Sequence, residues 1–311
     1  MRRFSLNYLL LAIWLLMYVA FATQNPDVLL RMATIQAVFS SADVYVFLGL
    51  AALITLYVGE FDLSVPNAMG LSATLVPVLN VLHGVPLVLS VAIAILTAGI
   101  VGAINGFLIV RLAIDPLVTT LATGTVMLGA ALGIAHENPV GGLSRGFSEL
   151  AVNRVFGLTL TFWYGLIIAL IFAYVIYFTP LGRSMTFVGS NREVARLAGI
   201  SVGRIRFGAY LFGSTLAGAA GVLLAARLGG FDPSSSSGYL LPTFATVFVS
   251  AAVITLGRFN PIGVLIGAYF ISTGTLGLQI LGVSGWSQQV FYGLSLVLAV
   301  TLVTILKRRS G

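Results

Sequence analysis

Long apolar blocks recur along this chain from Asn7 to Leu306, with only short polar stretches between them. Most are about as long as a helix that crosses a membrane. Inside a bilayer the backbone can satisfy its hydrogen bonds only in helices or a closed barrel, and these blocks lack the alternation of barrel strands. The sequence therefore predicts an all-α, polytopic membrane protein with about ten transmembrane helices. The predicted spans are 7–23, 44–58, 66–82, 85–110, 114–135, 160–179, 207–229, 240–257, 262–281 and 288–306.

The composition agrees with lipid as the main solvent. Of the 311 residues, 59% are hydrophobic and only 8% are charged, whereas a soluble domain carries about a quarter charged residues. The absence of cysteine excludes disulfides and thiolate metal sites. The polar stretches 136–159 and 230–239, predicted to lie outside the cytoplasm, are too short for a separate domain. We therefore expect residues 1–311 to form a single transmembrane domain.

The basic residues lie at the edges of the apolar blocks, where they indicate topology. With ten crossings and a cytoplasmic start, twelve of the 16 lysine and arginine residues fall on the cytoplasmic side. This excess follows the positive-inside rule, so we expect both termini in the cytoplasm. The net charge of +7 forms no stripe with interleaved aromatic residues. We therefore expect contact with membrane lipid and no nucleic-acid partner.

The first 24 residues allow two interpretations. Arg2 and Arg3, an apolar core and Ala20-Phe21-Ala22 also fit a cleaved secretory signal. We favour a retained first helix, because many similar helices follow and need no export signal to enter the membrane.

A basic segment, GRSMTFVGSNREVARLAGISVGRIRFGA (182–209), separates two apolar blocks and carries five arginines but a single acid, Glu193. Ser190 and Glu193 have the spacing of a capping box, which starts a helix. Gly199 stands where a left-handed C-cap would end that helix, with Ile200 closing over it. The pattern predicts a short cytoplasmic helix at about 190–199, between the sixth and seventh spans.

This short helix has two faces. Val194, Leu197 and Ala198 share an apolar side, while Arg192 and Arg196 share the other. A helix of this length is marginal alone in water, so its apolar side needs a surface to rest on. The residues leave two interpretations open: a helix lying on lipid headgroups, or a helix docked in a groove of a cytoplasmic partner.

The segment GEFDLSVPNAMG (59–70) places two acids beside an apolar block. We favour a capped turn, with Asp62 or Ser64 as the N-cap and Pro66 in the first turn of the next helix. The alternative is a broken helix that buries Glu60 and Asp62, and burial would indicate a functional site because unpaired acids in a membrane are costly. Glu60, Asp62 and Ser64 are therefore a candidate functional loop.

Four stretches resemble permease subunits from the ribose-type, carbohydrate-uptake branch of bacterial ABC importers. VGSNREVARLAGISVGRIRFGAY resembles the cytoplasmic coupling segment of that family, and GEFDLSVPNAMGLSATLV its Asp-Leu-Ser signature after the second helix. RLAIDPLVTTLATGTVMLGAALGIA and the segment from GRFNPIGVLIGAY to FYGLSLVLAV are similar to a threonine-containing helix and the closing helical pair. The matches are in order from about residue 40 to residue 306. The chain departs from the family at Gly59-Glu60, where two glycines are frequent, and in VSAAVITLGRFNP, where a glycine-rich run is frequent.

The resemblance implies a type II-like ABC importer permease in the bacterial inner membrane. Its expected partners are two ABC ATPase subunits or one tandem ATPase, which bind ATP and Mg, a second permease subunit that is identical or related, and an extracytoplasmic sugar-binding protein. It further implies that the short helix couples the permease to the ATPase. The expected coupling residues are Ser190, Asn191, Arg192, Glu193, Val194, Arg196, Leu197, Gly199 and Ile200.

Polar residues inside the predicted spans are mostly hydroxyls and amides, which suit a neutral solute. Each could instead make a hydrogen bond between helices, worth about 0.6 kcal/mol on average. The candidate pathway residues are Asn105, Thr119, Thr120, Thr123, Ser272, Thr273 and Gln279.

The chain has no G-x-x-x-x-G-K-[ST] phosphate-binding motif, and its one lysine is Lys307. We therefore expect no enzymatic activity and no cofactor bound by this chain. The main alternative is an ion-coupled secondary transporter of a small polar solute, which normally uses acids or histidines within its spans. A membrane enzyme would need clustered carboxylates, a metal site or a nucleophile with its base, and we find no such pattern. The sequence does not name the solute.

Overall fold

The computed structural model of the chain describes residues 9–255, 257–283 and 285–310. These residues divide into two compact units, which we describe separately. The first unit comprises Met1–Gly49, Arg154–Ala173 and Leu241–Gly311. The second unit comprises Leu50–Asn153 and Tyr174–Leu240.

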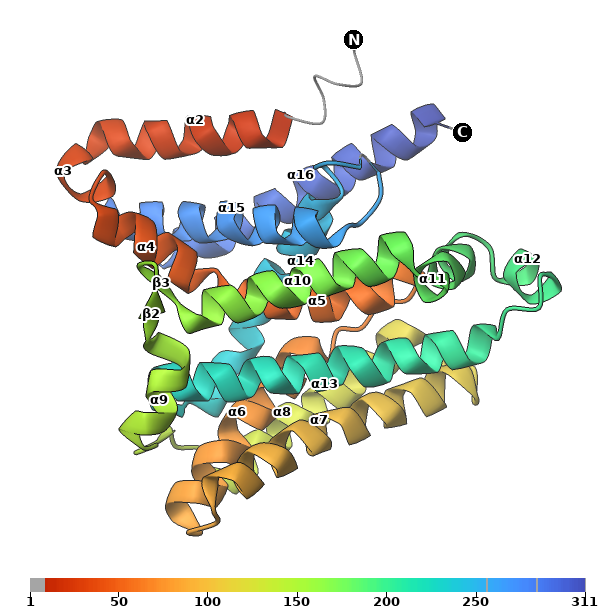
Figure 1. Cartoon of the computed structure of the whole chain (residues 1–311), viewed down its shortest axis with the longest axis horizontal. Helices are drawn as coiled ribbons and strands as arrows, with labels where there is room; N and C mark the ends of the chain where they lie inside the picture. Colours follow the sequence, from red (N-terminus) through yellow and green to blue (C-terminus); the bar gives the residue numbers. More distant parts are fainter. Residues whose placement is uncertain (1–8, 256, 284, 311) are drawn as a thin grey trace. The chain divides into compact units, whose positions relative to one another are not determined.

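Helices make up almost all of the regular structure in the described residues (Figure 1). Two antiparallel pairs of two-residue strands join β1 (Val140–Gly141) to β4 (Gly230–Phe231) and β2 (Arg154–Val155) to β3 (Leu158–Thr159). The α-helices are α2 (Leu9–Gln24), α3 (Pro26–Leu29), α4 (Met32–Ser41), α5 (Asp43–Tyr57), α6 (Val65–Pro77), α7 (Leu87–Val110), α8 (Pro116–Ile134), α9 (Arg145–Val152), α10 (Leu160–Phe178), α11 (Pro180–Ser190), α12 (Arg192–Leu197), α13 (Val202–Leu228), α14 (Leu240–Ser250), α15 (Pro261–Ile280) and α16 (Trp286–Ser310), with a π-helical turn η1 (Val78–Leu82) after α6 and a 3-10 turn η2 (Pro233–Tyr239) before α14.

Seven helical segments in the described part of the chain are long and apolar enough to cross a membrane. The fold is therefore all-α and polytopic, as the sequence predicts. Two further apolar helices, Leu10–Gln24 and Trp286–Leu302, are shorter, so the count of about ten remains a prediction. The seven segments are Met32–Tyr57, Val65–Leu82, Leu87–Val110, Pro116–Ile134, Leu160–Phe178, Val202–Leu228 and Pro261–Ile280.

Two predicted spans have different bounds in the structure. The span predicted at 240–257 ends as a helix at Ser250, because Asn260 organises an irregular stretch after it: its Nδ2 donates to the carbonyl oxygens of Ser250 at 2.9 Å and Val253 at 3.0 Å. The span predicted at 44–58 begins too late. Met32–Tyr57 forms one apolar segment of 26 residues, whose first half was missed because polar side chains interrupt its apolar run.

The second unit is built around α6 and α13, which pack against each other and against α7 (Figure 1). These helices approach closely at glycines. A Cβ on Gly221 of α13 would lie 2.1 Å from the carbonyl oxygen of Met69 in α6, and a Cβ on Gly102 of α7 would lie 2.5 Å from that of Tyr210. Only glycine permits backbones to come so near, as in other membrane helix pairs.

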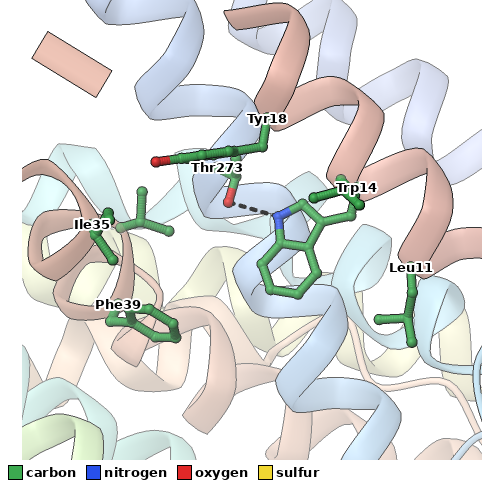
Figure 2. Close-up of a pocket in the computed structure, with 8 residues that line it drawn as sticks. Leu11, Trp14, Tyr18, Ile35, Phe39 and Thr273 are labelled. Atoms are coloured by element: carbon green, nitrogen blue, oxygen red, sulfur yellow. Dashed lines mark hydrogen bonds between the residues drawn. The ribbon is translucent and has the colours of Figure 1, made fainter. Parts of the chain in front are cut away.

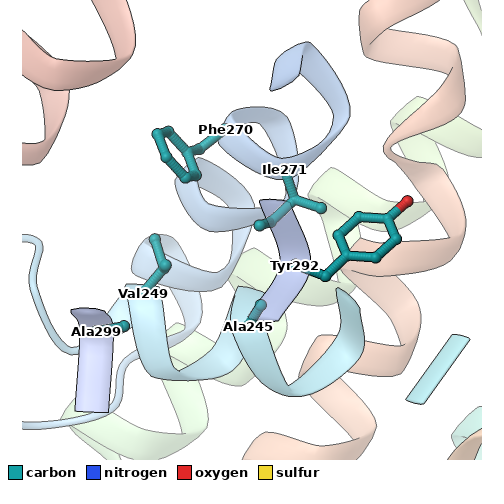
Figure 3. Packing of buried hydrophobic residues seen from close by; sticks show 6 residues of the cluster. All are labelled: Ala245, Val249, Phe270, Ile271, Tyr292 and Ala299. Carbon is teal, nitrogen blue, oxygen red and sulfur yellow. The ribbon is translucent and has the colours of Figure 1, made fainter. Parts of the chain in front are cut away.

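The core of the first unit joins α14, α15 and α16. Figure 3 shows Ile271 and Phe270 of α15 beside Ala245 and Val249 of α14, with Tyr292 of α16 next to them. In the same unit, a Cβ on Gly267 would lie 2.5 Å from the carbonyl oxygen of Thr246. The glycines of α15 therefore allow α14 to lie directly against it.

Candidate functional site

The loop between α5 and α6 belongs to the second unit, and its polar side chains are buried, whereas Gly59 and Phe61 are exposed. Gly59 ends α5 with φ of +78°, a left-handed conformation that favours glycine. The chain then turns back, and the Glu60 amide donates to the carbonyl oxygen of Thr55 at 2.9 Å. The side chains of Glu60, Asp62 and Ser64 are all buried. Of the two interpretations open from the sequence, the structure favours the buried one.

The Glu60 carboxylate is held by three side chains from two helices. Oε1 accepts hydrogen bonds from Nη2 of Arg192 at 2.8 Å and from Nε of Arg206. The hydroxyl of Tyr210 donates to Oε2 at 3.2 Å and also lies 3.3 Å from the carbonyl oxygen of Phe61. A buried carboxylate is tolerated only when it is paired and hydrogen-bonded in this way. We call Glu60, Arg192, Arg206 and Tyr210 the Glu60 cluster.

Asp62 shapes the next turn. Its Oδ1 accepts from the amide of Ser64 at 2.9 Å and from the Ser64 hydroxyl, while Ser64 makes no side-chain cap on α6. Ser64 therefore occupies the N-cap position of α6 as predicted, but its hydroxyl is engaged with Asp62 in a local Asx turn instead of capping the helix. Pro66 lies in the first turn of α6 as expected. Burial raises the pKa of the Asp62 carboxyl from 3.8 to about 6, against the lowering effect of its two hydrogen bonds from Ser64.

Two other helices of the second unit fix this turn. Nδ2 of Asn105 in α7 donates to the hydroxyl oxygen of Ser64 at 3.0 Å, and the hydroxyl oxygen of Thr120 in α8 accepts from the amide of Leu63 at 3.0 Å. The loop is therefore hydrogen-bonded to α7 and α8 as well as to α12 and α13. Asp62 Oδ2 and Asn105 Oδ1 are buried acceptors without a hydrogen-bond partner among the described residues.

The short helix α12 forms where the sequence predicts it, but its start differs. Asn191 is the N-cap, and its side chain accepts from the amides of Glu193 at 3.0 Å and Val194 at 3.1 Å. The predicted capping box with Ser190 is wrong. Ser190 is instead the last residue of α11, a helix not anticipated from the sequence, and its hydroxyl donates to the carbonyl oxygen of Thr186 at 2.7 Å.

The end of α12 matches the prediction. Gly199 has φ of +78°, its amide donates to the Arg196 carbonyl, and the Ile200 amide donates to the Ala195 carbonyl, both at 3.0 Å. These two bonds define a Schellman motif. The turn fixes how α12 ends before α13 begins.

The exposed side of α12 differs from the predicted one. Ala195 is buried, whereas Leu197 is 88% exposed and Val194 is 50% exposed, so the predicted apolar side has no cover within the described residues. Arg192, predicted to lie on a free polar side, turns inward to Glu60. Glu193 and Arg196 remain exposed next to Leu197. We call Glu193, Val194, Arg196 and Leu197 the α12 tip.

The candidate pathway residues are divided between the units. Asn105, Thr119, Thr120 and Thr123 belong to the second unit, and the hydroxyls of the three threonines donate to carbonyls one turn earlier in α8. Such bonds satisfy the hydroxyl but leave its oxygen able to accept. Their role in a pathway stays a prediction.

The other three candidates lie on α15 in the first unit. Ser272 donates to the Val38 carbonyl at 3.0 Å, and Gln279 is exposed. Thr273 borders a cavity of about 430 Å³, where its hydroxyl oxygen accepts from the Trp14 indole nitrogen at 2.9 Å (Figure 2). The cavity is otherwise lined mainly by apolar side chains, and the hydroxyl of Tyr18 is bound to the Leu29 carbonyl. It offers a polar solute few partners.

Sequence reasoning missed Arg206 and Tyr210 as partners of the candidate loop. One signal was available: with a cytoplasmic start, the acid-bearing turn after the second predicted span and the segment with five arginines after the sixth fall on the same side of the membrane. Local spacing carries no register between residues 146 positions apart, such as Glu60 and Arg206. The pairing therefore required the folded structure.

The described part of the chain combines long apolar helices with the short, capped helix α12 between α11 and α13. A family model described as "Branched-chain amino acid transport system / permease component" matches residues 34–300. The chain belongs to this family. It is thus a multi-pass inner-membrane permease component and not itself an enzyme.

Curated relatives are permease proteins of transport and import systems. The D-allose transport system permease protein AlsC of Escherichia coli (strain K12) is 28% identical over 93% of this chain and 88% of its own length. The ribose import permease protein RbsC of Bacillus subtilis (strain 168) is 32% identical over 78% of this chain and 76% of its own length. The autoinducer 2 import system permease protein LsrD of Salmonella typhi is 28% identical over 96% and 91%. No solved structure gives a significant match.

Proposed function

We propose that this chain is the permease subunit of an ATP-driven uptake system for a monosaccharide or a related polyol or furanose. It forms the translocation pathway and takes its driving force from separate ATPase subunits. The allose and ribose relatives support a carbohydrate, and the autoinducer 2 relative supports a wider set of small polar solutes. One family match spans segments of both compact units, which supports a single permease domain.

The observation that carries this proposal is the α12 tip. A six-residue helix has little stability of its own, yet α12 is capped at both ends and holds Leu197 almost fully in the open. An exposed apolar side chain flanked by Glu193 and Arg196 suits a groove with polar edges. The occupant of that groove is α12, and the groove belongs to an ABC ATPase subunit, which binds ATP and Mg.

The rest of the assembly follows from this docking. Two ATPase subunits or one tandem ATPase lie on the cytoplasmic side, a second permease subunit completes the pathway, and an extracytoplasmic binding protein delivers the solute. Both termini of this chain are cytoplasmic. Arg2 and Arg3, on which that orientation partly depends, lie outside the described residues, as do the side chains of 306–310.

Transport then requires a movement of packed helices. Nucleotide-driven closure of the ATPase pushes α12, and α11 and α13, which contact it, carry the push to the other helices of the second unit. The hydroxyl and amide side chains named above line the path of a neutral solute. Solute affinity resides chiefly in the binding protein, so a tight site in the permease is unnecessary.

The test is Leu197→Asp, with Phe156→Asp as the matched control, because Phe156 is a 92% exposed apolar side chain in a different loop. A buried interface anchor is worth about 2 kcal/mol or more. We expect Leu197→Asp to weaken co-purification of the ATPase at least about 30-fold and to abolish solute-stimulated ATP hydrolysis, while its yield in the membrane is unchanged. Normal assembly and stimulation in Leu197→Asp would refute the proposed docking.

The alternative, an ion-coupled secondary transporter, has one supporting observation: Asp62 is a buried acid, and one of its carboxylate oxygens has no hydrogen-bond partner in the part of the chain that the structure describes. Uptake by an ABC permease should continue when the proton and sodium gradients are collapsed and ATP is maintained. Loss of uptake under those conditions would favour the alternative.

A further inference from the structure

We propose that Glu60 is a positioning residue through which movement of α12 reaches α6, with Arg192 as the arm that makes the connection. This inference rests on the proposed coupling role of α12. It concerns the route by which a push on the α12 tip enters the helix bundle.

Glu60 connects α12 and α13 to the start of α6. The single oxygen Glu60 Oε1 contacts Arg192, the first residue of α12, and Arg206 in the second turn of α13. Glu60 itself lies five residues before Val65, where α6 begins. Only the short segment 61–64 therefore separates Glu60 from α6. A displacement of either arginine acts directly on the start of that helix.

The end of α5 and the loop after it pack closely against α11 and Arg192. A Cβ on Gly189 of α11 would lie 2.2 Å from the carbonyl oxygen of Tyr57, and the Thr186 hydroxyl donates to the Tyr57 hydroxyl at 3.2 Å. Nη2 of Arg192 also donates to the Gly59 carbonyl at 3.1 Å. Arg192 thus grips both the backbone and the side chain of the loop. Closely packed helices move as rigid bodies, so a displacement of α12 is passed on to the loop and is not absorbed by local rearrangement.

The two arginines that bind Glu60 differ in the exposure of their side chains. The Arg206 side chain is only 16% exposed, whereas the Arg192 side chain is 43% exposed. Arg206 and Tyr210 satisfy the charge of Glu60 from within α13, which is anchored in the core by its contacts with α6 and α7. Arg192 is the partner that α12 can carry with it. Its loss leaves Glu60 paired.

The helix α6 connects the loop to the core of the second unit. Eleven of the 13 residues of α6 are buried, and the helix packs against α7, α8 and α13. The loop before it is bound by Asn105 of α7 and Thr120 of α8, both candidate pathway residues. Movement of the loop therefore reaches the side chains that the proposed function places along the solute path.

The variant Arg192→Gln tests this inference in the complete complex of permease, ATPase and binding protein, reconstituted in proteoliposomes. Arg204→Gln is the matched control, because Arg204 is an exposed arginine in the first turn of α13. Ribose and allose, each with a binding protein specific for it, serve as the probes. The readouts are ATPase binding, basal ATP hydrolysis, stimulation of hydrolysis by loaded binding protein, and uptake.

We expect Arg192→Gln to keep ATPase binding and basal hydrolysis within about twofold of wild type but to lose at least fivefold of the stimulation and uptake. Arg192→Lys, which retains the charge, should recover part of the loss, and Arg204→Gln should behave as wild type. Full stimulation and uptake in Arg192→Gln would overturn the inference and leave the proposed function intact. Loss of ATPase binding would also overturn it, because Arg192 would then belong to the docking surface.

The proposed function fails in a different way. It is lost if wild-type permease neither binds the ATPase nor supports solute-stimulated hydrolysis, or if Leu197→Asp leaves both unchanged. Those results do not depend on Arg192.

Discussion

At the scale of single residues, the loop between α5 and α6 concentrates the unusual chemistry of the chain. Its two acids are buried by different means. Glu60 is paired with two arginines and a tyrosine hydroxyl, whereas Asp62 has one oxygen bound by Ser64 and one that has no hydrogen-bond partner among the described residues. Substitutions at the two positions should therefore have different consequences.

Glu60→Gln should strongly destabilise the protein. It removes the carboxylate that compensates the mostly buried Arg206 side chain, and breaking a buried pair in this way costs about 3–5 kcal/mol. Thermal unfolding of the purified protein in detergent measures the effect. Glu149→Gln, which removes an exposed pair with Arg145, should change stability by about 1 kcal/mol at most. Equal shifts for the two variants would show that the Glu60 cluster does not hold the fold.

Asp62→Asn should alter the dependence of stability on pH. The folded pKa of about 6 lies above the value of 3.8 for the free side chain, so the folded state favours the protonated carboxyl. The contribution of Asp62 to folding stability is therefore most favourable below pH 3.8, falls as pH rises from about 4 to about 6, and stays reduced above that. The size, at 1.36 kcal/mol for each unit of pKa, is about 3 kcal/mol.

Melting temperatures between pH 4 and pH 7 measure this contribution. The difference in melting temperature between Asp62→Asn and wild type should shift in favour of the variant as pH rises through this range. Parallel profiles for the two proteins would show that Asp62 does not titrate with a raised pKa.

At the scale of elements, residue patterns over a few positions were sufficient to locate many helices. The exact residue at which a helix begins or ends also depended on its neighbouring elements. The Schellman end of α12 was predictable because Gly199 and Ile200 are adjacent in sequence to the helix they close. Its start was not, because α11 extends to Ser190 and engages the hydroxyl expected to serve as the cap. The segment α4 escaped prediction because Thr34 and Gln36 interrupt its apolar pattern.

The close contact of α13 with α6 yields a test at this scale. Gly221→Ala would place a methyl group 2.1 Å from the Met69 carbonyl oxygen, and overpacking of this kind costs about 1–3 kcal/mol. Gly208→Ala in the same helix meets nothing within 4 Å, so it should be neutral or slightly stabilising through its better helix propensity. Thermal unfolding of the two variants measures the difference. A stable Gly221→Ala protein would contradict the packing of α6 on α13.

The candidate site illustrates what a sequence leaves out. Its polar residues were recognisable singly: Glu60 and Asp62 as acids beside a span, and Arg192 as part of a basic segment. Their pairing was not, because hydrogen bonds between residues more than 130 positions apart depend on the packing of whole helices. The candidate pathway residues could also be recognised singly, but the sequence did not predict that they belong to two different compact units.

At the scale of the whole molecule, the chain is a membrane permease without an ATPase motif, and we propose that it receives force through α12. This requires that the α12 tip faces the cytoplasm and is covered by the ATPase. The two compact units share one family match, over residues 34–300, so both belong to the same transport component. The orientation of the chain decides whether the tip can meet a cytoplasmic partner.

The natural chain contains no cysteine, so single cysteines introduced at Leu197 and, as an outer reference, at Phe156 report orientation without background. The most direct measurement is labelling of Leu197→Cys and Phe156→Cys by a membrane-impermeant thiol reagent in intact spheroplasts and in inverted vesicles. We expect Leu197→Cys to react only in inverted vesicles and to be protected when the ATPase is bound, while Phe156→Cys reacts only in spheroplasts. Labelling of Leu197→Cys in intact spheroplasts would rule out a cytoplasmic α12 tip.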